Sequence, residues 1–265
     1  MPRTKPDTEA SKPVRPRSWL RAIVMAPIEW VGRHELSVLF ALFLVILATW
    51  GFVELADEVI EGGTQEFDDW AIRAMRRPDD LAIPIGPSWL HEVGRDLTAL
   101  GGMAMLALMT AAVTGFLWLR RMYSALWLVL IATAGGLAGS TLLKLLFARE
   151  RPALVPHLSI VMTHSFPSGH STLSAVVYLT LGTLLGRFVS EWRLKAYFLF
   201  VALTLTALVG VIRVYLGVHY PTDVLAGWTV GLAWALLCWV VARYLQRRGA
   251  VEPEGSMDVP AENRR

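Results

Sequence analysis

Six uncharged apolar stretches run along the chain, with polar and charged positions between them. They cover residues 36–53, 97–119, 122–143, 171–186, 196–212 and 224–242. An α-helix crosses the hydrocarbon core of a bilayer in about 20 residues, with a range of about 17–25. The fourth stretch is short, but Arg187 lengthens it if its side chain extends to the interface. The pattern predicts an all-α fold, a polytopic membrane bundle of six transmembrane helices.

The segment between the first two stretches, residues 54–96, has a helical pattern of its own. Apolar side chains recur there at helical spacing, with aspartates and arginines on the other faces: Phe67, Trp70, Ala71, Ala74 and Met75. Thr64 is placed to cap this helix, and Pro78 follows it. Residues 64–77 are therefore predicted to form a short extracytoplasmic amphipathic helix, which lies on the membrane surface or packs over the bundle.

Composition also indicates a membrane protein. Hydrophobic residues make up 54% of the 265 residues and charged residues 18%, with a mean hydropathy of +0.47, whereas a soluble domain carries about 25% charge. Eleven tryptophans fit a protein anchored at two membrane interfaces. The net charge of +3 is spread over segment ends and tails. This distribution argues against a nucleic-acid partner and for a lipid bilayer.

Polar tails flank the apolar region. Residues 1–33 are basic and Pro-rich, and residues 249–265 are polar, so both are predicted to be largely disordered. The six-span domain is expected to occupy residues 34–248. The first apolar stretch follows about 35 residues and is too long for the core of a signal peptide, so it is predicted to remain in the mature protein.

Loop charge predicts the orientation of the spans. Basic residues outside the N-terminal tail concentrate on one side: Arg120, Arg121, Arg187, Arg193, Lys195, Arg243, Arg247 and Arg248. On the other side lies the 54–96 segment, in which acidic residues outnumber arginines. Cytoplasmic loops carry the excess of Lys and Arg. Both termini are therefore predicted to be cytoplasmic.

An ordered set of residues at the ends of the later stretches falls on the extracytoplasmic side. It comprises Lys144, Arg151-Pro152, Pro167-Ser168-Gly169-His170, Arg213, His219 and Asp223. Cations bind phosphoryl oxygens, a histidine serves as nucleophile or acid, and a carboxylate orients a histidine. The set suffices for metal-free hydrolysis of a phosphate ester, and the sequence has no separate metal-ligand cluster.

Spacing within the set favours these roles. Lys144 and Arg151 are seven apart, nearly two helical turns, so their side chains point the same way if the helix persists. Gly169 permits close backbone approach at a helix N-terminus, which favours an anion. His219 and Asp223 are four apart, so that the carboxylate can accept the Nδ1 proton and leave Nε2 free.

Each segment also has a plain structural interpretation. Lys144 can extend to the membrane interface, as single cations at span ends commonly do. Ser168 can simply cap a helix beside an interfacial His170, and Asp223 can cap the next helix beside a bystander His219.

The three segments together resemble the three-part signature of the type-2 phosphatidic acid phosphatase superfamily. In the first part, six residues separate Lys144 from Arg151-Pro152, and the second part is Pro-Ser-Gly-His. In the third part, five residues separate Arg213 from His219 and three separate His219 from Asp223. The likeness covers roughly residues 36–245 and points to the membrane branch of the family.

The resemblance implies a role for each matched residue. His219 would attack phosphorus to form a phosphohistidine, Asp223 would orient it, and His170 would protonate the leaving group and then activate water. The phosphoryl oxygens would be held by Lys144, Arg151, Ser168, the Gly169 backbone N–H and Arg213. Neither a metal nor another cofactor is implied.

Some residues fall outside the signature. The family commonly has a serine where this chain has Ile212, which casts doubt on rate or substrate preference. His157 and His164 match no signature position and are predicted to be loop residues. Cys238 is expected to pack as a small hydrophobe. Gly135 and Gly139, like Gly227 and Gly231, are expected to serve helix packing.

The predicted function is hydrolysis of a lipid phosphate or lipid pyrophosphate in a bacterial plasma membrane, with the site facing outward. Undecaprenyl pyrophosphate, phosphatidylglycerol phosphate and phosphatidic acid are the candidate substrates, and the first is favoured by family analogy. A vanadate-binding haloperoxidase is an alternative that six spans disfavour. A non-enzymatic lipid or phosphate transporter is another, although transporters place ionisable groups near the midplane.

Overall fold

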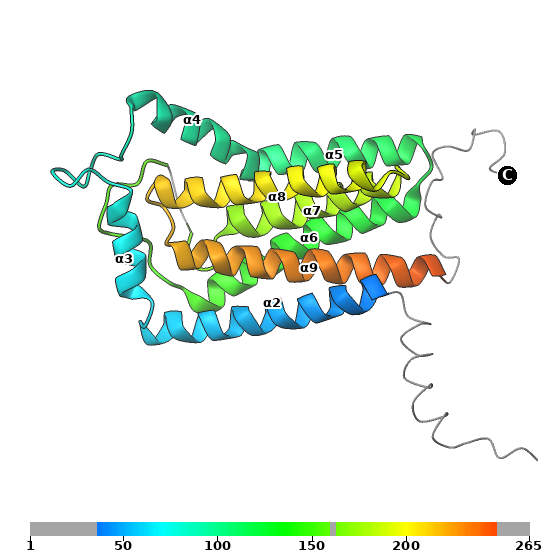
Figure 1. Cartoon of the computed structure of the whole chain (residues 1–265), viewed down its shortest axis with the longest axis horizontal. Coiled ribbons are helices and arrows are strands. Elements are labelled where there is room, and N and C mark those ends of the chain that lie inside the picture. Colours follow the sequence, from blue (N-terminus) through cyan, green and yellow to red (C-terminus); the bar gives the residue numbers. More distant parts are fainter. Residues whose placement is uncertain (1–35, 160–162, 248–265) are drawn as a thin grey trace, which may run out of the picture. The chain divides into compact units, whose positions relative to one another are not determined.

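The computed structural model of the protein describes residues 36–159 and 163–247. Within these ranges the regular elements are all helical, apart from an isolated bridge between Arg76 and Pro84. They are α2 (Leu36–Glu61), α3 (Gln65–Ala74), α4 (Ser88–Thr98), η1 (Ala99–Gly101), α5 (Met103–Leu119), α6 (Tyr123–Phe147), α7 (Gly169–Arg187), α8 (Trp192–Tyr215) and α9 (Pro221–Arg247) (Figure 1). The predicted tails, 1–33 and 249–265, lie outside the described residues. Residues from Phe40 onward form one compact unit, and Leu36–Leu39 is the described part of the other.

Four of the described helices are long and apolar enough to cross a membrane: α2, α6, α8 and residues Pro221–Leu245 of α9. A fifth span is possible if Ser88–Gly101 and Met103–Leu119, bent by 46°, cross together. Helix α7, which contains the fourth apolar stretch, is the remaining expected span. It has 19 residues, and its serines and threonines lower its hydropathy. The structure thus supports a bundle of four or five apolar spans, and the sixth span remains a prediction.

Helix α7 lies at the centre of the bundle, packed against α6, α8 and α9. Its residues Ser171 to Gly182 are all buried. Helix α9 approaches it closely because Gly227 has no side chain: a Cβ there would lie 2.7 Å from the carbonyl oxygen of Ser168. This approach, together with a hydrogen bond of 2.9 Å from the backbone N–H of Ser168 to the carbonyl of Asp223, sets the start of α9 beside the start of α7.

The 54–96 segment contains more helix than its sequence pattern predicts. Helix α2 continues to Glu61, and α4 was not anticipated. Helix α3 forms within the predicted range, although the side chain of Thr64 makes no capping hydrogen bond. Ile72 of α3 is fully buried against residues of α8, α9 and their connection, so this helix packs over the bundle. Contact of α3 with a membrane surface remains a prediction.

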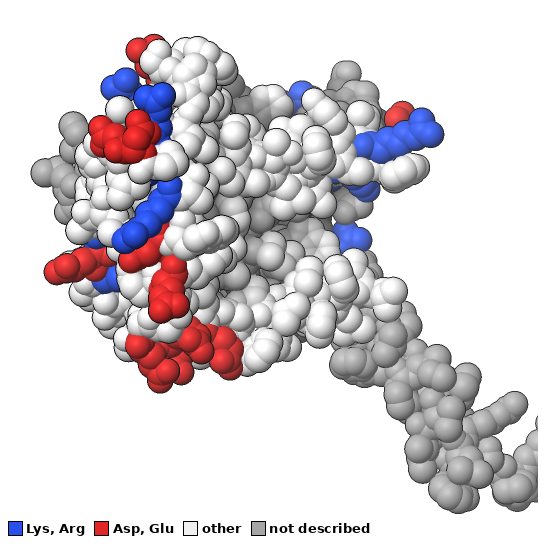
Figure 2. Space-filling view, turned by 60° about the vertical axis from the view of Figure 1, so that its left-hand side comes forward, with Lys and Arg blue, Asp and Glu red and all other residues white. Residues whose placement is uncertain are grey.

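Charged side chains gather at the ends of the helices and leave the band between them almost uncharged (Figure 2). Large apolar side chains are exposed in that band, among them Phe43, Ile46 and Trp50 of α2. Exposed apolar area of this extent in water would drive association, whereas a bilayer solvates it. The protein is therefore a membrane protein.

Candidate active site

The predicted site residues converge on one cavity of about 680 Å³. It lies where the end of α6, the start of α7 and the α8–α9 connection meet. Six of the eight predicted residues line it: Lys144, Arg151, Gly169, His170, Arg213 and His219. The other two, Ser168 and Asp223, are fully buried.

His219 lies in the connection between α8 and α9, and Asp223 lies in the first turn of α9. Nδ1 of His219 lies 3.3 Å from Oδ2 of Asp223. The same carboxylate oxygen accepts a short hydrogen bond from the hydroxyl of Ser165 and one of 2.9 Å from the backbone N–H of Tyr220. The histidine and the carboxylate are both buried. Oδ2 is thereby fixed against the Nδ1 side of the ring.

The other ring nitrogen of His219 faces an arginine. Nη1 of Arg151 lies 3.2 Å from Nε2 and donates to the carbonyl of Val218 at 2.6 Å. A guanidinium has only donors, so Nε2 must accept, and the proton of the neutral ring lies on Nδ1. A second contact, from Nε of Arg151 to the carbonyl of Thr163 at 2.8 Å, holds the arginine in place. The ring has the tautomer that an attack by Nε2 needs.

Burial lowers the pKa of His219 to about 3, although Asp223 opposes this shift. The nearby cations Arg151 and Arg213 lower the pKa further. The ring is therefore neutral at neutral pH, and Nε2 keeps the lone pair that a nucleophile requires.

Lys144 and Arg213 bring two more cations to the cavity. Nζ of Lys144 donates to the carbonyl of His164 at 2.7 Å. Arg213 is 2% exposed, and its Nη1 lies 3.5 Å from the hydroxyl of Thr98. Its Nε is buried and has no hydrogen-bond partner within residues 36–159 and 163–247. Arg213 lines the cavity, and its positive charge is suited to an anion there.

The helix that carries Lys144 does not continue to Arg151. Helix α6 ends at Phe147, and Ala148 has a left-handed backbone with φ of 45°. A left-handed residue at this position closes a helix, so Arg151 lies on the following loop. Both side chains reach the same cavity all the same.

Ser168, at the start of α7, makes the contacts of a helix cap, and its contact with phosphate remains a prediction. Its hydroxyl accepts hydrogen bonds from the backbone N–H of Ser171 at 3.5 Å and from the Ser171 hydroxyl at 3.0 Å. Because Ser168 does not line the cavity, its side chain serves as a helix cap. A Cβ at Gly169 would lie 3.3 Å from Cε of Lys144, so the glycine lets the lysine pass close to the helix start. His170 follows in the first turn and lines the cavity.

Three polar residues of the site were not predicted: Ser165, Arg149 and Asp68. Arg149 donates to Oδ1 of Asp223 and to Oδ2 of Asp68, each at 2.8 Å. Asp68 comes from α3 and is fully buried. The sequence pattern placed it on a charged face of the amphipathic helix. A partner 81 residues away gives no local signal.

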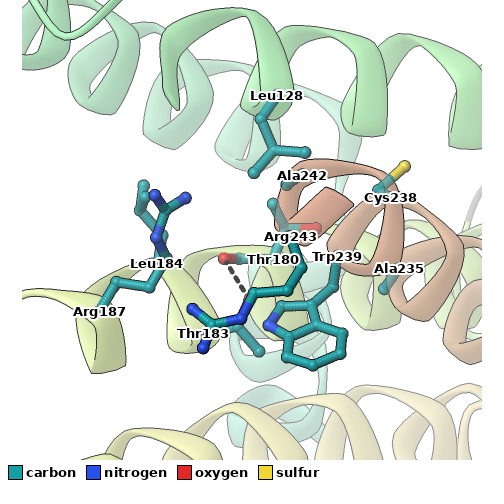
Figure 3. A pocket seen from close by; sticks show the side chains of 10 residues that line it. All are labelled: Leu128, Thr180, Thr183, Leu184, Arg187, Ala235, Cys238, Trp239, Ala242 and Arg243. Carbon is teal, nitrogen blue, oxygen red and sulfur yellow. Dashed lines mark hydrogen bonds between the residues drawn. The ribbon is translucent and has the colours of Figure 1, made fainter. Parts of the chain in front are cut away.

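His157, His164 and the cysteine lie where loops and packing were expected. Nε2 of His157 lies 2.8 Å from the carbonyl of Pro152, and His157 does not line the cavity. His164 is exposed and does line it. Cys238 is buried. It borders a separate cavity of about 20 Å³ together with Arg187 and Arg243 (Figure 3). Among residues 36–159 and 163–247, no histidine or carboxylate lines that cavity.

Apolar side chains from α5, α6 and α7 also line the large cavity. Met103, Leu137, Leu145 and Leu173 line it together with the cations. A ligand with an anionic end and a hydrocarbon end matches this lining.

In residues 36–159 and 163–247, no three His, Cys, Asp or Glu side chains gather in a group that could hold a metal ion. The cavity brings the neutral, oriented His219 together with His170 and with the cations Lys144, Arg151 and Arg213. A nucleophile, an acid and donors for developing negative charge are the parts that phosphoryl transfer requires.

Comparison with known proteins gives consistent matches. The family model of the PAP2 superfamily matches residues 124–247. Phosphatidylglycerophosphatase B of Bacillus subtilis (strain 168) is 33% identical over 185 residues, which cover 68% of this chain and 86% of that protein. Lipid A 1-phosphatase of Rhizobium etli is 27% identical over 185 residues, covering 60% and 75%. The crystal structure of a transmembrane PAP2-type phosphatidylglycerolphosphate phosphatase from Bacillus subtilis has a TM-score of 0.70 and 28% identity, covering 77% of this chain and 98% of that one.

Proposed function

The chain belongs to the PAP2 superfamily, as its three motifs predicted, and we propose that it is an integral membrane phosphatase acting on lipid phosphates. The proposed catalytic residues are His219, His170 and Asp223. The proposed phosphate ligands are Lys144, Arg151, Arg213 and the backbone N–H of Gly169, and Ser168 supports them by capping α7.

In the first half-reaction, Nε2 of His219 attacks phosphorus and the bond from phosphorus to the lipid oxygen breaks. The negative charge of a bound phosphate favours the protonated form of His170, which gives its proton to the departing oxygen. Asp223 accepts the hydrogen bond from Nδ1 and stabilises the positive charge that the phosphorylated ring acquires. The cations stabilise the phosphoryl oxygens as negative charge builds on them.

In the second half-reaction, His170 takes a proton from water and the resulting hydroxide attacks the phosphohistidine. The bond between phosphorus and Nε2 breaks, which returns the lone pair to His219 and releases inorganic phosphate. The three cations supply the charge stabilisation that a metal ion provides in other phosphatases, so the reaction is proposed to need no metal.

The observation that supports a lipid substrate is the lining of the 680 Å³ cavity, which joins three cations to apolar side chains. The headgroup phosphate would lie against the cations and the hydrocarbon against α5 and α6. Phosphatidylglycerol phosphate fits this description, and the relative from Bacillus subtilis carries a name that indicates this substrate. Undecaprenyl pyrophosphate and phosphatidic acid are the other proposed substrates.

Charge distribution supports an outward-facing site. The connection between α5 and α6 carries Arg120 and Arg121, while Arg187 ends α7 and Arg193 lies in the first turn of α8. Both connections, α5–α6 and α7–α8, lie at the end of the bundle away from α3 and α4 (Figure 1). Under the positive-inside rule that end is cytoplasmic. The cavity lies near the other end and is proposed to face the periplasm or exterior of a bacterial cell.

The test is release of inorganic phosphate by the purified protein from a panel of lipid phosphates and pyrophosphates in detergent micelles with excess EDTA. We expect release from at least one lipid of the panel, undiminished by the chelator. Activity that disappears on chelation and returns with a divalent ion would exclude the metal-free mechanism. No release from any lipid, with lipid movement between vesicles instead, would favour the transporter.

A further inference from the structure

The carboxylate of Asp223, beside His219, takes part in a series of buried ion pairs with Arg149 and Asp68. Oδ1 of Asp223 accepts from Nη1 of Arg149 at 2.8 Å, and Nη2 of the same guanidinium donates to Oδ2 of Asp68 at 2.8 Å. Both carboxylates have side chains 0% exposed, and the arginine side chain is 13% exposed. The chain of contacts therefore runs from α3 through the 148–168 loop to the nucleophile.

We infer that Asp68 and Arg149 are positioning residues for the reaction, which act through Asp223 on His219. The inference rests on the proposed function for the chemistry of His219, and on the contacts alone for the geometry. Neither residue was assigned a role by the three motifs.

The first argument concerns the freedom of the Asp223 carboxylate. The torsion that turns an aspartate carboxylate is broad, so contacts must set its angle. Arg149 occupies Oδ1, while Oδ2 receives the Ser165 hydroxyl, the Tyr220 backbone N–H and Nδ1 of His219. This division of the two oxygens is what presents Oδ2 to the ring.

The second argument concerns Arg149 itself. It lines the cavity, but its charge is already committed, because each end of the guanidinium contacts a carboxylate. Burial alone would lower the pKa of Arg149, yet Asp223 and Asp68 outweigh it and the pKa is raised. Its guanidinium also lies 4.3 Å from the centroid of the Tyr220 ring. Arg149 is therefore a fixed support and not a fourth phosphate ligand.

The third argument concerns Asp68, which connects α3 to the start of α9. Its Oδ1 accepts from the backbone N–H of Thr222 at 3.1 Å, and its Oδ2 accepts from the Thr222 hydroxyl at 2.6 Å. Thr222 directly precedes Asp223. Asp68 therefore holds both the backbone next to Asp223 and the arginine that contacts the Asp223 carboxylate. Without the charge of Asp68, Arg149 is free to turn toward a phosphate in the cavity.

The test compares Asp68→Asn with Asp69→Asn, one residue along the same helix. Asp69 accepts only a surface hydrogen bond of 2.8 Å from Gln65 among the described side chains, so it controls for charge removal from α3. For Asp68→Asn we expect kcat on p-nitrophenyl phosphate to fall about 100-fold, as for a small misplacement of a reacting group, with KM nearly unchanged. Asp69→Asn should keep the wild-type kcat.

A double-mutant cycle with Asp223→Asn separates positioning from general damage. If Asp68 acts through Asp223, adding Asp68→Asn to Asp223→Asn costs little further activity. Independent, additive losses would overturn the inference, as would a wild-type kcat in Asp68→Asn. If Asp68→Asn does not fold, Arg149→Lys takes its place in the same cycle, because a lysine cannot bridge two carboxylates in this way.

A second readout does not depend on activity. Nitrogen-15 NMR of labelled histidines, with the His219 signals identified by their loss in His219→Gln, reports which ring nitrogen carries the proton. We expect the Nδ1–H tautomer in the wild type and in Asp69→Asn, and a mixture of tautomers in Asp68→Asn. An unchanged tautomer in Asp68→Asn would contradict the inference. Absence of phosphate release by the wild type would instead contradict the proposed function. The comparison of His219 tautomers would still test the positioning role of Asp68.

Discussion

Nη1 of Arg151 lies 3.2 Å from Nε2 of His219, so the arginine contacts the nitrogen that is proposed to attack phosphorus. Together with Asp223 on the Nδ1 side, the contact fixes the tautomer of the ring before any substrate arrives. A phosphate entering the cavity offers the guanidinium two oxygens, a better match to its planar fork than one ring nitrogen. The exchange would free Nε2 at the moment when phosphorus comes within reach.

The first prediction concerns that exchange. Arg151→Lys keeps the charge and loses the planar pair of guanidinium donors. Inhibition by inorganic phosphate should therefore weaken about 10-fold or more, the effect of losing one hydrogen bond to a charged group. The inhibition constant measures it. Arg95→Lys makes the same change at an exposed position of α4 and should leave the constant unchanged. Equal constants for Arg151→Lys and wild type would remove Arg151 from the phosphate site.

The second prediction concerns the proposed acid, His170. A general acid contributes about 10²–10⁴-fold, and less when the leaving group is already a weak base. His170→Ala should therefore retain a larger share of wild-type activity on p-nitrophenyl phosphate than on an alkyl phosphate. His164→Ala removes an exposed histidine from the same cavity. It should leave the ratio of the rates on the two esters unchanged. Equal losses on the two esters would argue against His170 as the acid.

The third prediction follows from the pKa of His219, which burial lowers to about 3, whereas an unfolded chain binds a proton there near pH 6.5. Between these values unfolding takes up a proton, so stability falls as the pH drops from about 6.5 toward 3. This one group changes the free energy of unfolding by at most about 1.4 kcal/mol per pH unit. The Tm of the detergent-solubilised protein should fall between pH 7 and 5, and less steeply in His219→Gln. Identical slopes would show that the ring is not buried in its neutral form.

The positions of the cations and histidines could be predicted because their motifs lie next to apolar stretches whose ends must meet at a membrane interface. Lys144, His170, Arg213 and His219 line one cavity for this reason. Helical spacing does not explain why Lys144 and Arg151 meet, because Ala148 ends the helix between them. Sequence spacing does not reveal a single left-handed residue.

The support behind the site could not be predicted from local patterns. Asp68 pairs with Thr222, 154 residues later, and periodicity alone cannot tell a buried aspartate from a solvated one on a charged helix face. Helix α7 shows the same limit: its serines and threonines face other helices, so its hydropathy is below that of a lipid-exposed span. Ser168 caps α7, and its contact with phosphate remains a prediction, because serine is suited both to a helix cap and to an anion.

The fourth prediction concerns orientation. Cys238 is buried and is the single cysteine of the chain, so one introduced cysteine can be labelled selectively. Asp79→Cys, exposed on the loop after α3, should react with an impermeant thiol reagent in intact cells, and Glu191→Cys, exposed before α8, only after lysis. The reverse pattern would place the active site on the cytoplasmic side.

The most direct test of the proposed mechanism is to look for phosphate on His219 during turnover. Phosphohistidine survives alkaline quenching, so peptides from a reaction stopped in base and read by mass spectrometry should carry a phosphoryl group on His219. The amount should rise in His170→Ala on p-nitrophenyl phosphate, because water is no longer activated, and should be zero in His219→Ala, which should not turn over. Full turnover by His219→Ala, or a phosphoryl group on another residue of the active wild type, would contradict the account.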